Sequence, residues 1–192
     1  MRFVVGVELA IPVVDRLSLL QEETEPLFFE AGGRVRWTPV EQLRLNLKVF
    51  KNLEAGAVQR VQEMLTDFAK AVRPFSFDTR NTSAERGPGM AKLLTTEVFD
   101  ESETLAPLQR HIDRAADRIG FESDDRPWHP KVLIGRLATP TQAVDFDTIL
   151  APYQNTVWGP TECRELVLYR SQVVGRESRV RVLRRFSLGT GL

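Results

Sequence analysis

The sequence is poor in the residues that build disulfide frameworks and metal centres. It contains one cysteine, Cys163, and two histidines, His111 and His129, among 192 residues. A single cysteine excludes an internal disulfide and any zinc site made of paired thiols, and two histidines exclude a histidine-rich metal centre. The sequence gives no sign of a metal ion or an organic cofactor.

Net charge and long apolar runs are also absent. The 26 Lys and Arg residues balance the 26 Asp and Glu residues, so a basic protein that coats nucleic acid indiscriminately is excluded. No apolar run reaches the ~18 residues of a membrane span, and no small-residue cleavage site follows the short apolar stretch at the N-terminus. We expect a cytoplasmic protein without a membrane partner. We expect a monomer, although the sequence shows no long apolar surface stripe and leaves the oligomeric state open.

The overall composition, with 42% hydrophobic and 27% charged residues, is typical of a globular protein. Hydrophobic periodicity predicts strands and helices in alternation. Strands are expected at 2–10, 43–50, 74–80, 92–99, 130–137, 164–173 and 178–188, the last two as a hairpin around Gly175. Helices are expected at 12–30, 54–72 and 101–119. Residues 34–37 form a short extended piece, residues 81–89 have the composition of a loop, and 138–160 give no clear pattern.

The order of these elements predicts an α+β protein. Each half has a long helix followed by a strand with polar or cationic alternate positions, so we expect residues 1–192 to form one domain of two similar, pseudo-symmetric lobes. A cleft between such lobes is a natural ligand site.

Several segments resemble the two-histidine (2H) phosphoesterases, in the branch of bacterial 2'-5' RNA ligases and RNA 2',3'-cyclic phosphodiesterases (LigT-like proteins). The resemblance runs nearly end to end. It is carried by MRFVVGVEL at the start, Trp37-Thr38-Pro39, Gly120-Phe121, the stretch 126–130, and the closing LYRS and FSL segments. It implies two lobes of antiparallel sheet with outer helices around a central cleft.

The family's chemistry uses one His-x-Thr motif from each lobe. One histidine acts as base and the other as acid, while the two hydroxyls hold phosphate oxygens. Here the first motif position reads Arg44-Leu45-Asn46 and the second reads Lys131-Val132-Leu133. Both histidines and both threonines are replaced, so the resemblance implies the scaffold without its usual acid and base.

The replacing side chains are poorly suited to proton transfer but well suited to binding an anion. Arg44 cannot exchange a proton near neutral pH, and Lys131 does so only if its pKa falls by several units. Arginine, lysine and asparagine nevertheless suit an anion. Strand alternation in 43–50 predicts Arg44, Asn46 and Lys48 on one face, with Leu43, Leu45, Leu47 and Val49 on the other.

The leading hypothesis is a catalytically degenerate cyclic phosphodiesterase-like protein. It binds a phosphate-bearing ligand, such as an RNA end, a cyclic phosphate or a nucleotide, between the lobes without efficient turnover. The expected ligand-binding residues are Arg44, Asn46, Lys131, Arg136, Tyr169 and Ser171. An alternative is an active enzyme that uses Lys131 with His129, which shares strand parity with Lys131. A second alternative is a protein-interaction role with a vestigial cleft.

Three remaining features have simpler interpretations beside functional ones. His111 is expected to be a solvated helix residue, and Cys163 an inert thiol. The segment 164–192 contains seven arginines and two glutamates. It is interpreted either as a basic guide for an RNA backbone or as an edge strand protected by charge.

Overall fold

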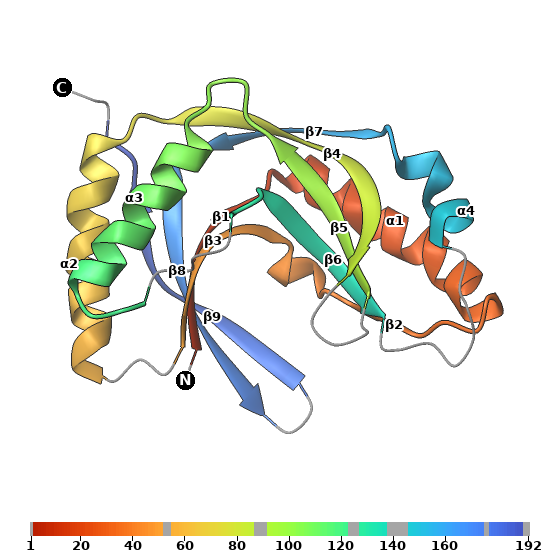
Figure 1. Ribbon diagram of the computed structural model, residues 1–192, viewed down its shortest axis with the longest axis horizontal. Helices are drawn as coiled ribbons and strands as arrows, with labels where there is room; N and C mark the ends of the chain where they lie inside the picture. The colour runs from red at the N-terminus through yellow and green to blue at the C-terminus, as the bar shows by residue number, and fades with distance from the viewer. Residues whose placement is uncertain are drawn as a thin grey trace.

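The computed structural model describes residues 2–51, 55–86, 92–122, 127–137, 146–174 and 177–189. Within these ranges the chain forms two antiparallel sheets between helices that lie at opposite ends of the molecule (Figure 1). The first, sheet A, has the strand order β3-β1-β8-β9. Its strands are β1 (Arg2–Glu8), β3 (Arg44–Lys51), β8 (Glu165–Val174) and β9 (Glu177–Ser187).

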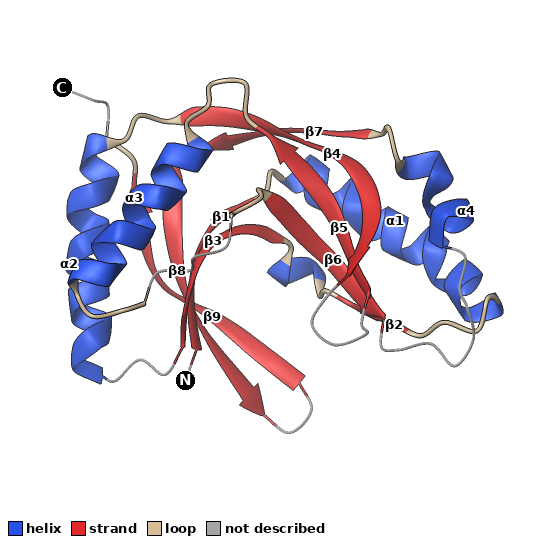
Figure 2. Ribbon diagram, in the orientation of Figure 1, coloured by secondary structure: helices blue, strands red, loops and turns tan. Residues whose placement is uncertain are grey.

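The second, sheet B, has the strand order β2-β6-β5-β4-β7. Its strands are β2 (Val35–Trp37), β4 (Phe75–Arg86), β5 (Lys92–Phe99), β6 (Lys131–Leu137) and β7 (Val157–Cys163). The helices are α1 (Ile11–Glu30), α2 (Ala55–Ala71), α3 (Leu105–Arg118) and α4 (Phe146–Leu150), with short 3-10 turns at Val40–Gln42 and Ala151–Tyr153. Figure 2 shows α2 and α3 beside sheet A, and α1 and α4 beside sheet B.

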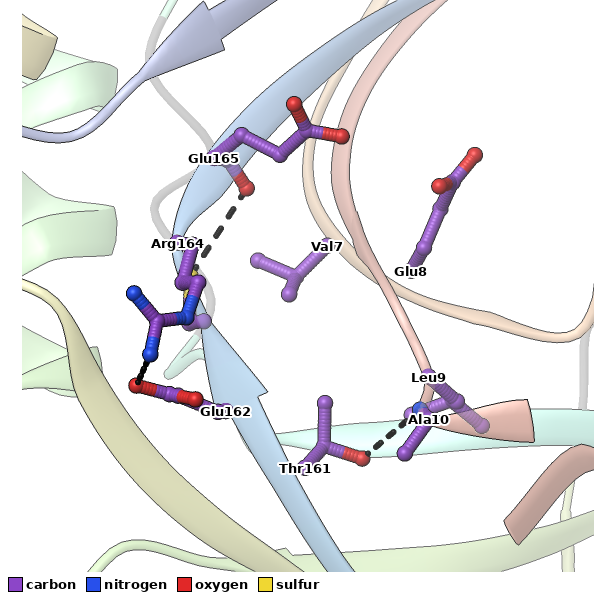
Figure 3. A pocket seen from close by; sticks show the side chains of 9 residues that line it. Val7, Glu8, Leu9, Ala10, Thr161, Glu162, Arg164 and Glu165 are labelled. Atoms are coloured by element: carbon purple, nitrogen blue, oxygen red, sulfur yellow. Dashed lines mark hydrogen bonds and ion pairs between the residues drawn. The ribbon is translucent and has the colours of Figure 1, made fainter. Parts of the chain in front are cut away.

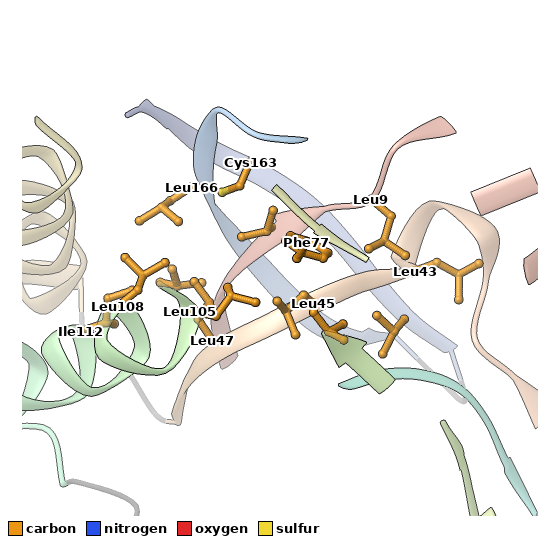
Figure 4. Packing of buried hydrophobic residues seen from close by; sticks show 14 of the residues in the cluster. Leu9, Leu43, Leu45, Leu47, Phe77, Leu105, Leu108, Ile112, Cys163 and Leu166 are labelled. Atoms are coloured by element: carbon orange, nitrogen blue, oxygen red, sulfur yellow. The ribbon is translucent and has the colours of Figure 1, made fainter. Parts of the chain in front are cut away.

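The apolar stripes of the helices bury one face of each sheet. On α3, Leu105, Leu108 and Ile112 recur at helical spacing and pack in one cluster with Leu45 and Leu47 of β3 (Figure 4). The corresponding face of sheet B packs against apolar residues of α1 in the same cluster. Each sheet therefore has a helix-covered face and an opposite face, which we call its open face.

Most expected elements are confirmed, and so is the α+β fold with two antiparallel sheets and flanking helices. The predicted loop at 81–89 is wrong for residues 81–86, which belong to β4. The strand continues to Arg86 after a bulge at Asn81, whose φ is 53°. The stretch 138–160, which gave no clear pattern, contains α4 and the start of β7. The expected turn at Gly175 and the glycines at 87 and 89 lie outside the described residues.

Strand β3 does not alternate regularly, which corrects the prediction for Lys48 and Val49. The pairing of β1 with β3 shifts register between Val5 and Gly6, so β3 contains an extra residue there. Lys48 consequently turns to the helix-covered face and pairs with Asp113 of α3. Val49 turns to the open face, where it packs with Val4 and other apolar residues.

Candidate functional site

Arg44 occupies the first motif position and lies flat across the open face of sheet A. From β3 its side chain passes over Gly6 of β1 to Tyr169 of β8, where its Cζ atom is 4.2 Å from the ring centroid. Gly6 suits this crossing because it has no side chain on that face; an added Cβ would lie 2.6 Å from the Leu45 carbonyl oxygen. The cation–π contact therefore fixes the guanidinium on the sheet surface.

A network of ionised groups on β1, β8 and β9 supports Tyr169. The Tyr169 hydroxyl donates to Glu8 at 3.0 Å, and Arg185 binds the same carboxylate with two nitrogens at 2.7 and 2.9 Å. The hydrogen bonds from Arg185 hold the pKa of Glu8 below its ordinary value, although burial opposes this. Burial raises the pKa of Tyr169, so the phenol stays protonated and remains a donor.

The Arg44 guanidinium has no carboxylate partner among the described residues. Its Nε donates to Asn46 Oδ1 at 3.2 Å, whereas Nη1 is buried without a hydrogen-bond partner. The residue is 7% exposed, and burial lowers its pKa without making it a proton donor near neutrality. Because Glu8 is held by Arg185, the charge of Arg44 is not offset by a direct ion pair. Asn46 is exposed, and its Oδ1 accepts the hydrogen bond from Arg44. The Nδ2 amide group of Asn46 is its remaining hydrogen-bond donor.

Lys131, at the second motif position, is paired with a carboxylate. Its Nζ donates to Glu85 of β4, which also accepts a hydrogen bond from Thr95 of β5 at 2.9 Å. Burial acts to raise the pKa of Glu85, but the bonds from Lys131 and Thr95 and the nearby charges of Lys131 and His129 lower it overall. Glu85 is therefore ionised at neutral pH and neutralises much of the Lys131 charge.

The other candidate residues are dispersed over the two open faces. Arg136 is exposed and lies on the same face as Lys131, because a register shift between β5 and β6 intervenes. Ser171 is half-buried beside Arg2 in the register of sheet A. His129 is exposed just before β6. His111 is exposed on α3, as expected, and its Nδ1 lies 2.8 Å from the Pro107 carbonyl oxygen.

The two motif strands approach one another, although their cations engage different partners. Strand β3 contacts β6, and the Trp128 indole donates to the Asn46 carbonyl oxygen at 3.4 Å. Arg44 stacks on Tyr169, whereas Lys131 binds Glu85. Of the two cations at the motif positions, only Lys131 is therefore paired with a carboxylate within the described residues.

A cavity of about 340 Å³ lies beside this network, where β1 ends and β8 begins (Figure 3). Residues 7–10 and 161–165 line it, and Thr161 accepts a hydrogen bond from the Ala10 amide at 3.1 Å. None of the sequence-predicted ligand residues lines this cavity. In the described ranges no group of three His, Cys, Asp or Glu residues is placed to hold a metal ion, and no helix is long and apolar enough to span a membrane.

Cys163 lines the same cavity but is 1% exposed. Burial raises the pKa of its thiol to about 12, so almost none of it is thiolate at pH values near 8. We expect no reaction with Ellman's reagent in the folded protein and full reaction after unfolding in denaturant. Rapid labelling of the native protein would contradict this prediction.

Sequence reasoning missed the residues that hold the candidates in place. Glu8, Arg185 and Glu85 are far apart in the chain and belong to no motif. The only available signal was strand alternation, which places Glu8 on the face of Gly6 but gives no pairing between strands.

Comparisons with known proteins show a similar sequence and a shared fold. No family model matches the sequence. An RNA 2',3'-cyclic phosphodiesterase from Methanothermobacter thermautotrophicus is 24% identical over 172 residues, which cover 90% of each chain. The crystal structure of TT0787 from Thermus thermophilus has the same fold, with a TM-score of 0.79 and 20% identity over 100% of this chain and 99% of that one.

Two further solved structures share the fold. Escherichia coli LigT complexed with 3'-AMP has a TM-score of 0.74 at 17% identity and 97% coverage of both chains. Usb1 from Kluyveromyces marxianus has a TM-score of 0.53 at 11% identity, with 95% of this chain and 98% of that chain covered. The similarity to the phosphodiesterase extends along most of the chain, and the solved structures share its two-sheet architecture.

Proposed function

We propose that the protein binds a phosphate-bearing ligand, such as an RNA end, a cyclic phosphate or a nucleotide, on the open face of sheet A without efficient turnover. The observation that carries this proposal is the buried Arg44 guanidinium, which has no carboxylate partner among the described residues and one unpaired Nη1 donor. Burying an uncompensated charge is costly, and a bound anion offsets that cost. Crystal structures of E. coli LigT with 3'-AMP, ATP and phosphate support this class of ligand.

The absence of turnover follows from the side chains at the two motif positions. Arg44 stays protonated and cannot act as a base or acid near neutral pH. The Lys131 ammonium is bound to Glu85, and Leu133 offers no hydrogen bond to a phosphate oxygen. Binding is therefore retained while the proton transfers that open a cyclic phosphate are lost.

Calorimetric titration with a nucleoside 2',3'-cyclic phosphate tests the binding half of the proposal. We expect saturable binding that inorganic phosphate competes for, that weakens with added salt, and that is absent for the same nucleoside without phosphate. Equal binding of the nucleoside would contradict recognition of phosphate. No binding of either compound would favour a protein-interaction role for this face.

A second candidate function is cyclic phosphodiesterase activity with Lys131 and His129 as acid and base. The feature in its favour is that His129 comes just before β6 and lies near Glu85, which is the partner of Lys131. These three residues therefore gather beside the second motif position. An activity that rises through the titration of one near-neutral group, and that His129→Ala abolishes, is the mark of this alternative.

In this proposal, Glu85 and the ligand compete for the Lys131 ammonium. Replacing the Glu85 carboxylate by a neutral amide tests that competition. We expect Glu85→Gln to strengthen binding of the cyclic nucleotide by about two- to fivefold, because the Lys131 ammonium is no longer paired with a carboxylate. Glu63→Gln on α2 is the matched control, since it removes the same charge far from this group. Unchanged affinity in the Glu85 variant would exclude Lys131 from the site.

A further inference from the structure

The hairpin of β8 and β9 carries four arginines on the helix-covered face of sheet A. In the register of β8 and β9, Arg170 lies opposite Arg181, whereas Arg184 lies opposite the buried Leu168. Arg170 also lies opposite the core residue Phe3 of β1. Side chains two apart share a face of a strand, so Arg179 lies with Arg181. These four residues, which we call the hairpin arginine patch, therefore point away from the face that holds Arg44: Arg170, Arg179, Arg181 and Arg184.

The patch is uncompensated by carboxylates in the described part of the chain. The ion pairs of this region belong to Arg164 and Arg185 instead. Arg179, Arg181 and Arg184 are exposed, and the Nε of the half-buried Arg170 has no hydrogen-bond partner. Like charges directly opposite one another destabilise a strand pair. Arg170 and Arg181 face each other in this way and are therefore expected to weaken the pairing of β8 with β9. An anionic partner removes that cost.

We propose that the hairpin arginine patch binds the phosphodiester backbone of a single-stranded RNA whose terminal phosphate lies at Arg44. This inference rests on the proposed function and narrows its ligand from a nucleotide to a polynucleotide. Strand β9 is the outermost strand of sheet A, and its consecutive Arg184 and Arg185 point to opposite faces. An RNA chain that runs from Arg44 to the patch passes over this edge, where Arg185 is held by Glu8 and Glu165.

The composition of the patch favours RNA over a membrane or an acidic protein. Guanidinium groups match phosphate oxygens with paired donors, and a phosphodiester chain presents one charge per nucleotide at regular intervals. Membrane-binding surfaces combine cations with apolar side chains on one face. Here the exposed Val182 lies opposite Tyr169 on the open face, and Leu183, the unpaired residue of the register shift, is the one other exposed large apolar side chain among the described residues of β9.

Binding of labelled oligonucleotides, measured by fluorescence anisotropy at several salt concentrations, tests the inference. The probes are a nucleoside 2',3'-cyclic phosphate and an RNA of about ten nucleotides with the same 3' end, a length within the range of single-strand sites. The variant is Arg179→Ala with Arg181→Ala. The control is Arg110→Ala with Arg114→Ala, which removes two exposed arginines from α3, the helix that packs on β3.

We expect the hairpin variant to bind the oligonucleotide at least about tenfold more weakly, with a salt slope reduced by about 1.4, since each lost phosphate contact contributes roughly 0.7. Its affinity for the mononucleotide is expected to be unchanged. An oligonucleotide affinity equal to that of the α3 control overturns the inference, and so does an equal loss for both probes. Loss of binding to phosphatidylserine vesicles, with RNA binding intact, also overturns it in favour of a membrane.

The proposed function and this inference fail in different ways. If Arg44→Ala leaves mononucleotide binding unchanged, the proposed function fails, whereas the hairpin variant still reports on the patch through the oligonucleotide. Because the three patch arginines on β9 are exposed, their replacement is expected to preserve the fold, which the thermal unfolding midpoint of each variant checks.

Discussion

Replacing Arg44 by alanine is expected to weaken binding of a nucleoside 2',3'-cyclic phosphate by about ten- to hundredfold. This range follows from the loss of hydrogen bonds between a charged donor and a phosphate in a site largely shielded from water. Arg44 is the cation at the motif positions that no carboxylate neutralises within the described chain. Calorimetric titration of the wild type and the variant measures the difference directly.

Two companion variants separate charge from shape. Arg44→Lys keeps the charge but loses the planar fork and the stacking on Tyr169, so we expect an intermediate affinity. Arg110→Ala removes an exposed arginine from α3 and is expected to leave the affinity unchanged. Wild-type affinity in a folded Arg44→Ala protein would show that the guanidinium has a packing role instead of a binding role.

Replacing Lys48 by methionine is expected to cost about 3–5 kcal/mol of unfolding free energy. The Lys48 ammonium pairs with Asp113 of α3 and donates to the Glu122 carbonyl oxygen at 2.9 Å. The side chains of the two partners are only 7% and 14% exposed. Removing the cation leaves a largely buried carboxylate without a counter-charge, which is the costly half of a buried pair. For a chain of this size the unfolding midpoint should fall by roughly 10 °C.

A double substitution provides the control for this prediction. Lys48→Met together with Asp113→Leu removes both charges, and replacing a whole buried pair by apolar groups is often close to neutral. We therefore expect the double variant to recover most of the lost stability. Urea unfolding of the wild type, both single variants and the double variant completes the cycle. A single variant that unfolds at the wild-type denaturant concentration would contradict the assigned pair.

Hydrophobic periodicity was sufficient to predict α1, α2, α3 and the central strands, but not the short helix α4. The stripe of Leu105, Leu108 and Ile112 repeats at the spacing of a helix and packs as predicted. Strand β7 was missed because Gly159 and Pro160 argue against a strand. The structure accommodates both because β7 is the edge strand of sheet B, where a missing amide donor leaves no partner unsatisfied.

Irregular pairing between strands is the reason why side-chain orientations in β3 and the end of β4 were predicted wrongly. A sequence pattern of period two cannot reveal an inserted residue, so Lys48 was assigned to the wrong face of β3. The strand containing 74–80 was ended too early for a related reason. Asn81 has a positive φ and starts a polar stretch that resembles a loop, yet Thr82 beyond it is fully buried in the sheet.

The resemblance selected positions for the candidate site but gave none of the contacts around them. The resemblance identified Arg44 and Lys131, and the fold places them on strands that contact one another. Their partners come from distant strands, so the carboxylate beside Lys131 and the tyrosine beneath Arg44 depend on sheet order, which alternation does not encode. The two cations therefore look equivalent in sequence and differ in the structure.

The most direct test of binding without turnover uses an RNA oligonucleotide that ends in a 2',3'-cyclic phosphate. The protein is titrated until binding saturates, and ring opening is followed in the same samples beside a Lys131→Ala preparation. We predict saturable binding, weakened by Arg44→Ala, with no more ring opening than in buffer alone. Ring opening by the wild type that is lost in the Lys131→Ala or His129→Ala protein would contradict the proposal and establish a working phosphodiesterase.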